Sequence, residues 1–375
     1  MRITALIVGV ILTLATFLAL CQAMLVPRQS NSLIVRAVNS AVSAAAQAPL
    51  PLMRSYRMQD RWLSGAAPMT VLIALVAYVV ILIATLGLVV YGTTQLSLLE
   101  SMYQSGSTLT TLGIVEPVNV PSAITTFIAA FLGLVVIAVF IGYLLAIYGA
   151  YVARESGMAR VAMLAGEPAW GPVMIARGHL LGLPDKEVPD ASEWLNWICD
   201  TRLNSQVNPV LMRFRSTSGL RHWVTTTLAV MDAATLRVST SDSAPDPHLV
   251  QVLTEGTLSL ATLSGGTGAT SAERLHNWDL ERRMLAAVED APPADATACG
   301  VTRTQFDNAM DMIDAAGVSV PLTRDQVWCR FATIRAVYYQ DAATLAQQLH
   351  AVPAPWSGPR HPELAEIYPE RPSRA

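Results

Sequence analysis

The chain reads TLTTLGIVEP at residues 108–117, and the setting of this stretch decides the fold. It lies between two long apolar segments, Pro68–Gln95 and Pro121–Ala153, and neither segment contains a charged side chain. A short connector of small and hydroxylated residues between two such segments predicts a re-entrant loop that dips into a bilayer. Backbone at that depth must line water or be buried in protein, because lipid offers it no hydrogen bonds.

The composition of the whole chain agrees with a membrane protein. Of its 375 residues, 52% are hydrophobic and only 14% are charged, and the mean hydropathy is +0.40. So few charges are unusual for a water-soluble protein of this length. The formal net charge of -3 gives no indication of a nucleic-acid partner. The lipid bilayer is therefore the first partner that we expect.

Three segments are long enough to cross a hydrocarbon core of about 30 Å, which needs roughly 20 residues of helix. They are Ile3–Leu25, Met69–Tyr91 and Ser122–Tyr151. The third is longer than a span requires, so we expect it to tilt or to continue beyond the membrane as a helix. The first has the features of a signal peptide, but cleavage and export would carry the arginines that follow it outward.

The orientation of the spans follows from the arginines, since short basic loops are retained in the cytoplasm. The connector 26–68 carries Arg28, Arg36, Arg54, Arg57 and Arg61. Arg154 and Arg160 follow the third span, whereas Gly92–Pro121 contains neither lysine nor arginine. We therefore expect an uncleaved N terminus outside, the loop outside and the C terminus in the cytoplasm.

The composition changes along the chain predict five regions. Residues 1–67 form the first span and a basic connector, 68–153 form a pore module, and 154–190, rich in glycine and proline, form a linker. Residues 191–351 form a cytoplasmic all-α domain, and 352–375 form a disordered, proline-rich tail. The predicted fold is thus an all-α membrane protein with three transmembrane helices, a re-entrant pore loop and a cytoplasmic helical domain.

Within residues 191–351, apolar residues recur at helical spacing and few alternations are typical of strands. The predicted helices are Ser192–Ser205, Gly219–Ser239, Pro247–Leu263, Ser271–Asp290, Thr304–Ala316 and Thr323–His350. We expect Trp194 and Trp197 in the core of this domain. Asp232 interrupts an apolar helix, and we expect its carboxylate to face solvent rather than to be buried with a hydrogen-bond partner.

The connector itself leaves two interpretations open. Ser30–Leu63 has some helical character, with a weak apolar face that is half alanine at its later turns. It is either a plain connector between two spans or a basic amphipathic segment that lies along the inner leaflet, since such segments bind anionic lipid surfaces.

The loop contains the residue types that ion coordination by backbone requires. A cation that crosses lipid must exchange its water shell for other oxygens, and stacked carbonyls from several subunits can supply them. Thr111 offers a carbonyl and a hydroxyl, and Gly113 tolerates the dihedral angles that turn carbonyls inward. The preceding Ser97–Ser107 predicts a short helix whose C-terminal end points at the cavity, with Glu100 near its N terminus.

The motif Thr110-Thr111-Leu112-Gly113 between two spans resembles the potassium-channel filter TTVGYGD. The layout is similar to a bacterial potassium-channel-like family with an extra N-terminal span. The resemblance implies a homotetramer in the bacterial inner membrane, with potassium as the permeant ion. The ion-conducting filter that it implies consists of Thr110, Thr111, Leu112, Gly113, Ile114 and Val115.

The chain departs from that motif at three positions, where Ile114 replaces tyrosine, Val115 replaces the second glycine and Glu116 replaces aspartate. A β-branched residue such as Val115 resists positive φ, so the outermost carbonyl ring forms less readily and the pore discriminates less between cations. Glu116 is either a solvated loop acid or part of a carboxylate ring at the pore mouth. Gly133 and Gly142 either bend the third span as gating hinges or permit close helix packing, which we favour.

No residue pattern predicts an enzyme, a metal site or a cofactor. The six histidines have no metal-ligand spacing, and the four cysteines show neither paired spacing nor a disulfide framework. The first hypothesis is therefore a potassium or weakly selective monovalent cation channel. The alternative is a non-conducting, channel-like membrane anchor that carries a helical interaction or sensory domain.

Overall fold

The computed structural model describes residues 1–25, 33–183, 191–265, 277–289, 296–360 and 363–372. These residues form helices joined by turns and loops, and no strand occurs among them, which confirms the all-α class over this part of the chain. Their contacts divide the chain into two units. The N-terminal unit consists of Met1–Ala48, Gly65–Gly149 and Val207–Leu211, and the C-terminal unit of Pro49–Ser64, Ala150–Gln206 and Met212–Ala375. Arg28 of the basic connector lies outside the described residues.

In the described part of the chain, three helices are long and apolar enough to cross a membrane, as the sequence predicts. They contain the expected spans and are α1 (Arg2–Leu25), α4 (Ala66–Thr93) and α6 (Val120–Ala165). At 1.5 Å per residue the 46 residues of α6 extend for about 69 Å, far more than a bilayer core requires. Continuation beyond the apolar segment therefore accounts for the excess length of this helix.

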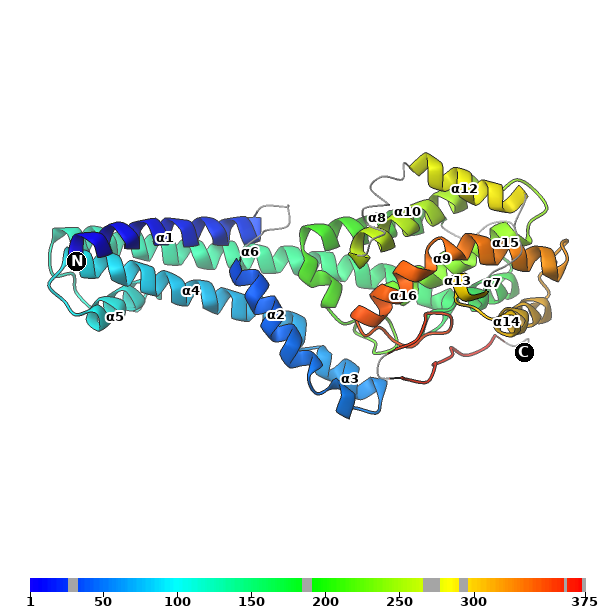
Figure 1. Cartoon of the computed structure of the whole chain (residues 1–375), viewed down its shortest axis with the longest axis horizontal. Coiled ribbons are helices and arrows are strands. Elements are labelled where there is room, and N and C mark those ends of the chain that lie inside the picture. Colours follow the sequence, from blue (N-terminus) through cyan, green and yellow to red (C-terminus); the bar gives the residue numbers. More distant parts are fainter. Residues whose placement is uncertain (26–32, 184–190, 266–276, 290–295, 361–362, 373–375) are drawn as a thin grey trace. The chain divides into compact units, whose positions relative to one another are not determined.

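The N-terminal unit is held together by close packing of α1 against α4. A Cβ on Gly9 would lie 2.8 Å from the Val89 nitrogen, and one on Gly92 would lie 2.6 Å from the Leu6 Cβ, so only glycine permits this approach. Arg2 donates a hydrogen bond to the Gln95 carbonyl at 3.3 Å. The start of α1 thus lies beside the end of α4 (Figure 1).

The basic connector forms two helices rather than one continuous segment. Helix α2 (Leu33–Gln47) belongs to the N-terminal unit, whereas the 3-10 turn Leu50–Leu52 and α3 (Tyr56–Leu63) belong to the C-terminal unit. Pro49 and Pro51 separate them, because proline lacks the amide that a continuing helix needs.

The C-terminal unit contains the end of α6 and a set of shorter helices. They are α7 (Gly171–Leu180), α8 (Ala191–Val207), the 3-10 turn Pro209–Arg213, α9 (Trp223–Thr240), α10 (Pro247–Ser264), α12 (Asn277–Glu289), α13 (Ala296–Cys299), α14 (Arg303–Ala316), α15 (Arg324–Ala336) and α16 (Tyr339–Gln348). Each predicted helix is found, although Thr323–His350 divides into α15 and α16 and residues 271–276 lie outside the described part.

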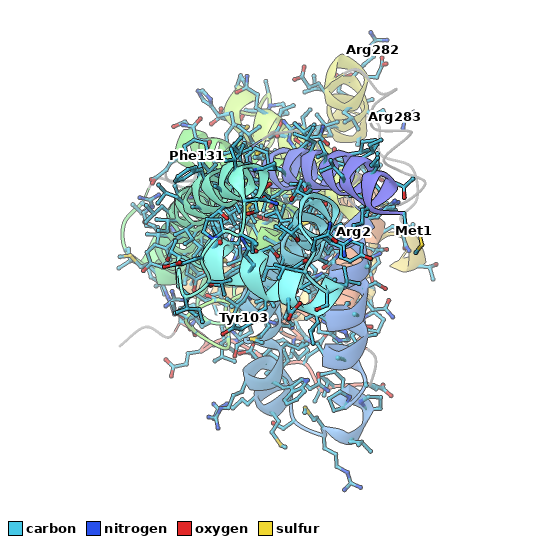
Figure 2. The ribbon with its side chains drawn as sticks, turned by 90° about the vertical axis from the view of Figure 1, so that its left-hand side faces the viewer. Met1, Arg2, Tyr103, Phe131, Arg282 and Arg283 are labelled. Atoms are coloured by element: carbon cyan, nitrogen blue, oxygen red, sulfur yellow. The ribbon has the colours of Figure 1, made fainter. Side chains whose placement is uncertain are left out.

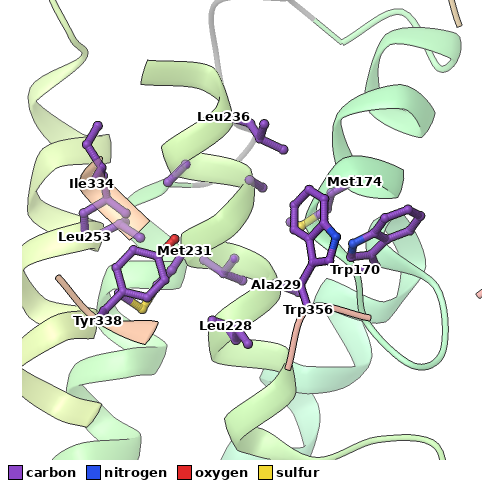
Figure 3. Packing of buried hydrophobic residues seen from close by; sticks show 14 of the residues in the cluster. Trp170, Met174, Leu228, Ala229, Met231, Leu236, Leu253, Ile334, Tyr338 and Trp356 are labelled. Carbon is purple, nitrogen blue, oxygen red and sulfur yellow. The ribbon is translucent and has the colours of Figure 1, made fainter. Parts of the chain in front are cut away.

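Helix α9 is the centre of this unit and is buried on every side, with α7, α10, α15 and α16 packed around it. Figure 3 shows apolar side chains from these helices meeting across α9, and Trp356 from the C-terminal segment joins them beside Trp170. The two indole rings meet edge to face with their centroids 5.5 Å apart. The expected core positions of Trp194 and Trp197 are confirmed, since both side chains are buried.

The expectation that Asp232 faces solvent is wrong. Its side chain is buried in α9, where its Oδ1 accepts hydrogen bonds from Arg335 Nε at 2.9 Å and from the Tyr338 hydroxyl at 2.8 Å. Burial raises the pKa of Asp232 and the Arg335 charge opposes that shift. A helix surrounded by other helices has no solvent face, so its acid must be paired with a buried cation.

The region 154–190 is not the linker that its glycines and prolines predict. Helix α6 runs through Ala165, α7 follows, and Met158, Val161 and Val173 are buried in the core of the C-terminal unit. Most of the described glycines and prolines of this region lie between helices or at helix ends, where they do not prevent the helices from packing into the core. Residues 184–190 of the expected linker lie outside the described part.

The expected disordered tail begins instead as a packed segment of the C-terminal unit. Val352, Trp356 and Arg360 are almost completely buried. Arg360 donates hydrogen bonds to the carbonyl oxygens of Ala351, Val352 and Ser357. Burial lowers the pKa of its guanidinium to about 10. The Arg360 guanidinium thereby supplies hydrogen bonds to carbonyl oxygens that lie outside any helix. The proline-rich composition of the segment does not reveal this role.

His222 is a buried cap for the central helix. It precedes α9, and its Nδ1 accepts a hydrogen bond from the Val224 amide at 3.3 Å, which requires an unprotonated nitrogen. Burial, together with the positive charges of Arg215, Arg154 and Arg360, holds the pKa of His222 well below 6.5.

We expect His222 to make the chain sensitive to acid. In the unfolded chain this imidazole takes up a proton below about pH 6.5, whereas the folded protein resists that proton. Because the unfolded state binds more protons, stability is lost as the pH falls, by at most about 1.4 kcal/mol per pH unit from this residue. The unfolding temperature of the detergent-purified chain at pH 7.5 and 5.5 measures the loss.

The matched variant is His222→Asn, which keeps a side-chain acceptor for the Val224 amide but does not titrate. Its unfolding temperature should differ less between pH 7.5 and pH 5.5 than that of the unmodified chain. An unchanged difference would show that His222 is not the group responsible.

Candidate functional site

The candidate site is built on α5 (Leu98–Leu109), the short helix that the sequence predicts between the second and third spans. Ser97 and Glu100 form a capping box at its start: the Ser97 side chain accepts from the Glu100 amide, and the Glu100 carboxylate accepts from the Ser97 amide at 2.8 Å. This reciprocal pair fixes where the helix begins. The Ser105 hydroxyl donates to the Ile83 carbonyl at 2.8 Å and so attaches α5 to α4.

Helix α5 turns its polar side chains toward protein. The buried ones are Ser101, Gln104, Ser105, Ser107 and Thr108. Gln104 Nε2 lies 3.4 Å from the Thr126 hydroxyl of α6, so α5 contacts both of its neighbours. Figure 2 shows Tyr103 of α5 and Phe131 of α6 on the surface of the N-terminal unit, where they are 59% and 65% exposed. Most of the polar side chains of α5 thus face protein and its largest exposed side chains are apolar or aromatic, which suits a helix that borders lipid on one side.

The backbone amides of the loop turn back onto α5. The amides of Leu112 and Gly113 donate to the Ser107 carbonyl at 2.8 and 3.1 Å, and the Ile114 amide donates to the Ser107 hydroxyl at 3.0 Å. None of the described residues donates a hydrogen bond to the carbonyl oxygens of residues 110–115. A single serine therefore holds the amides of residues 112–114, and the carbonyl oxygens of the turn have no donor within the described part of the chain.

Two residues of the loop adopt left-handed backbone conformations. Gly113 has φ of +66°, as the sequence argument expects of the glycine, and Thr111 has φ of +60°. A β-branched residue resists this region, so Thr111 stores strain that the hydrogen bonds to Ser107 must offset. Val115, which replaces a glycine of the filter motif, does not have a positive φ.

The sequence-predicted filter residues thus form one tight turn at the C-terminal end of α5. Thr110 to Ile114 are exposed in the single chain, with Leu112 at 63% and Ile114 at 57%. Glu116 is also exposed, beyond the turn. The C-terminal end of α5 directs the negative end of its dipole toward these carbonyls, an arrangement that favours a cation.

The two candidate hinge glycines of α6 have different surroundings. A Cβ on Gly133 would lie 2.1 Å from the Leu109 carbonyl oxygen at the end of α5, whereas a Cβ on Gly142 would meet no atom within 4 Å. Gly133 therefore allows α6 to contact the base of the loop, which fits the packing interpretation. A hinge role for either glycine stays a prediction.

Sequence reasoning missed the residue that anchors the far end of the loop. Asn119 Oδ1 accepts from the Ser122 amide at 2.9 Å and caps α6, while its Nδ2 donates to the Thr93 carbonyl at 2.8 Å. This one side chain joins the last turn of α4 to the first turn of α6. The pattern Asn119-Val120-Pro121 is a helix-start signal that could have identified it.

Among the described residues, no group of three or more His, Cys, Asp or Glu side chains is placed to hold a metal ion. No protein-family model, curated protein or solved structure matches this chain. The resemblance to potassium channels therefore depends on the loop motif and the order of the apolar segments alone.

We expect Gly133→Ala to displace the end of α5, because the added methyl group would overlap the Leu109 carbonyl. Overpacking of this kind costs about 1–3 kcal/mol. The unfolding temperature of the purified chain should fall, and any ion flux that depends on the loop should fall with it.

Gly142→Ala is the matched control, since the same methyl group on the same helix meets open space. Its unfolding temperature should remain that of the unmodified chain. Equal destabilisation by the two substitutions would contradict the close contact between Gly133 and α5.

Proposed function

We propose that this chain forms a channel for potassium or, with weak selectivity, for monovalent cations. The observation that carries the proposal is the run of carbonyl oxygens at residues 110–115, to which no described residue donates a hydrogen bond. They lie at the C-terminal end of a short helix between two long apolar helices. Carbonyls in this situation can replace the water shell of a cation. Lipid offers no hydrogen bonds to these carbonyl oxygens, so the proposed channel requires that they face water.

One chain cannot surround an ion, so the proposed channel is a homotetramer with the loops around a common axis. The exposed side chains of Leu112 and Ile114 support assembly, because large apolar side chains at this point need cover from protein or lipid. The resemblance of the TTLG motif to the potassium-channel filter supports four copies.

The proposed orientation places the loop outside a bacterial inner membrane and the C-terminal unit in the cytoplasm. It is supported by the arginines at positions 36, 54, 57, 61, 154 and 160 and by their absence from Gly92–Pro121. In this orientation α5 enters the bilayer from outside as a re-entrant helix. Glu116 then adds a carboxylate at the outer mouth, where a ring of four would raise the local cation concentration.

The non-conducting alternative also has a specific observation in its favour. The amides of residues 112–114 are all bound to Ser107, so the loop is a closed turn that is stable without an ion. A chain that keeps this turn for folding alone would anchor its C-terminal unit in the membrane and pass no current.

Flux measurements in liposomes separate the two proposals. Purified protein should pass potassium, and sodium to a lesser or equal extent, down an imposed gradient. The double variant Ile114→Tyr with Val115→Gly restores the motif residues and should raise the ratio of potassium to sodium flux. Liposomes without protein serve as the control for leakage of the vesicles themselves.

Flux by the double variant alone, with none from the unmodified chain, would support the non-conducting anchor. Absence of flux from both proteins, when both are folded and inserted, would contradict the channel altogether.

A further inference from the structure

Helix α3 has one face fixed to the C-terminal unit. Tyr56, Gln59 and Leu63 are buried on this face, and Tyr56 packs with Val352 of the C-terminal segment. The Asp60 carboxylate lies 3.5 Å from the Arg215 guanidinium and accepts a hydrogen bond from the Tyr56 hydroxyl at 3.4 Å. These contacts fix the rotation of α3 about its own axis and so decide which side chains face outward.

The opposite face of α3 combines cations with large apolar groups. Arg57 and Arg61 are exposed and one helical turn apart. Met58 and Trp62 are also one turn apart and are 59% and 51% exposed. Arg54 precedes the helix and is exposed as well. The face therefore alternates guanidinium groups with a thioether and an indole.

The charge of this face is not balanced by acids of its own segment. Asp60 is the only acidic residue in positions 1–99, and it points inward to Arg215. The ion pair thus removes the single negative charge from the outward face. Three arginines remain there with no carboxylate of the same segment beside them.

We propose that the outward face of α3, formed by Arg54, Arg57, Met58, Arg61 and Trp62, binds the headgroups of anionic phospholipids at the membrane surface. Guanidinium groups match phosphate oxygens in geometry and charge, and tryptophan is favoured where hydrocarbon meets water. Ser64 and Gly65 are the only residues between α3 and α4, so at most about 10 Å of chain separates α3 from a membrane-length helix.

An acidic protein partner fits these observations less well. A protein interface would not require α3 to adjoin a span, whereas a lipid surface does. The alternation of arginine with Met58 and Trp62 is typical of segments that lie at the boundary of headgroups and acyl chains. This proposal does not depend on ion passage and holds equally for a non-conducting anchor.

The test uses the full chain in a non-ionic detergent, titrated with phosphatidylglycerol or with phosphatidylcholine, with the unfolding temperature as the readout of binding. Phosphatidylglycerol should stabilise the unmodified chain more than phosphatidylcholine does. Arg57→Gln with Arg61→Gln should weaken the apparent affinity for phosphatidylglycerol by about 30-fold, since each arginine contributes about fivefold near an anionic surface.

The matched control is Arg282→Gln with Arg283→Gln, which removes the same charge from two exposed arginines of α12 (labelled in Figure 2). Its affinity for phosphatidylglycerol should remain that of the unmodified chain. All three proteins should unfold at the same temperature in phosphatidylcholine, which excludes a folding defect.

Two results would overturn the proposal. An equal loss of affinity in both double variants would show that net charge, and not α3, attracts the lipid. Unchanged phosphatidylglycerol affinity in Arg57→Gln with Arg61→Gln would exclude this face as a lipid site, and altered self-association of that variant would then assign the face to a second copy of the chain.

Discussion

The N-terminal unit depends on one constraint, which is that backbone polar groups between apolar helices must find partners within the protein. Helix α5 meets this constraint at its start through Ser97 and Glu100 and at its end through Ser107, which accepts hydrogen bonds from three consecutive loop residues. Gly133 lets α6 approach close enough to enclose the end of α5. The amides are thereby satisfied, and the carbonyls of the turn are left for water or ions.

The C-terminal unit solves a related problem with buried cations. Arg335 pairs with Asp232 inside the core and also donates to the Trp356 carbonyl at 2.6 Å, while Arg360 holds the carbonyls of an irregular segment. Removal of one partner leaves an unpaired buried charge, which destabilises a protein more than replacement of both partners by apolar residues does. Arg335 and Arg360 therefore join distant segments of this unit, whereas Arg57 and Arg61 of α3 face outward.

Sequence patterns predicted the elements of this chain better than their packing. Apolar segments of about 20 residues and helical spacing located α1, α4, α6 and most of the shorter helices, because these patterns are local. The same patterns gave wrong predictions for Asp232 and for the segment after Ala351. Whether an acid or a proline-rich segment is buried depends on contacts with distant parts of the chain, and for Asp232 the partner is Arg335. In the site, the loop and α5 were predictable, and the helix-start pattern at Asn119 could have identified its cap of α6. The bonds of Ser107 to the loop and of Asn119 to the Thr93 carbonyl arise from contacts that no motif encodes.

The central claim is that the turn after α5 faces water on the outer side of the membrane. The most direct measurement places a cysteine at Ile114 in a chain whose four native cysteines have been replaced, and labels intact cells with a membrane-impermeant maleimide. We predict labelling of Ile114→Cys before the membrane is permeabilised, and slower labelling when potassium occupies the turn. Labelling only after permeabilisation would contradict the account, because the loop would then open toward the cytoplasm.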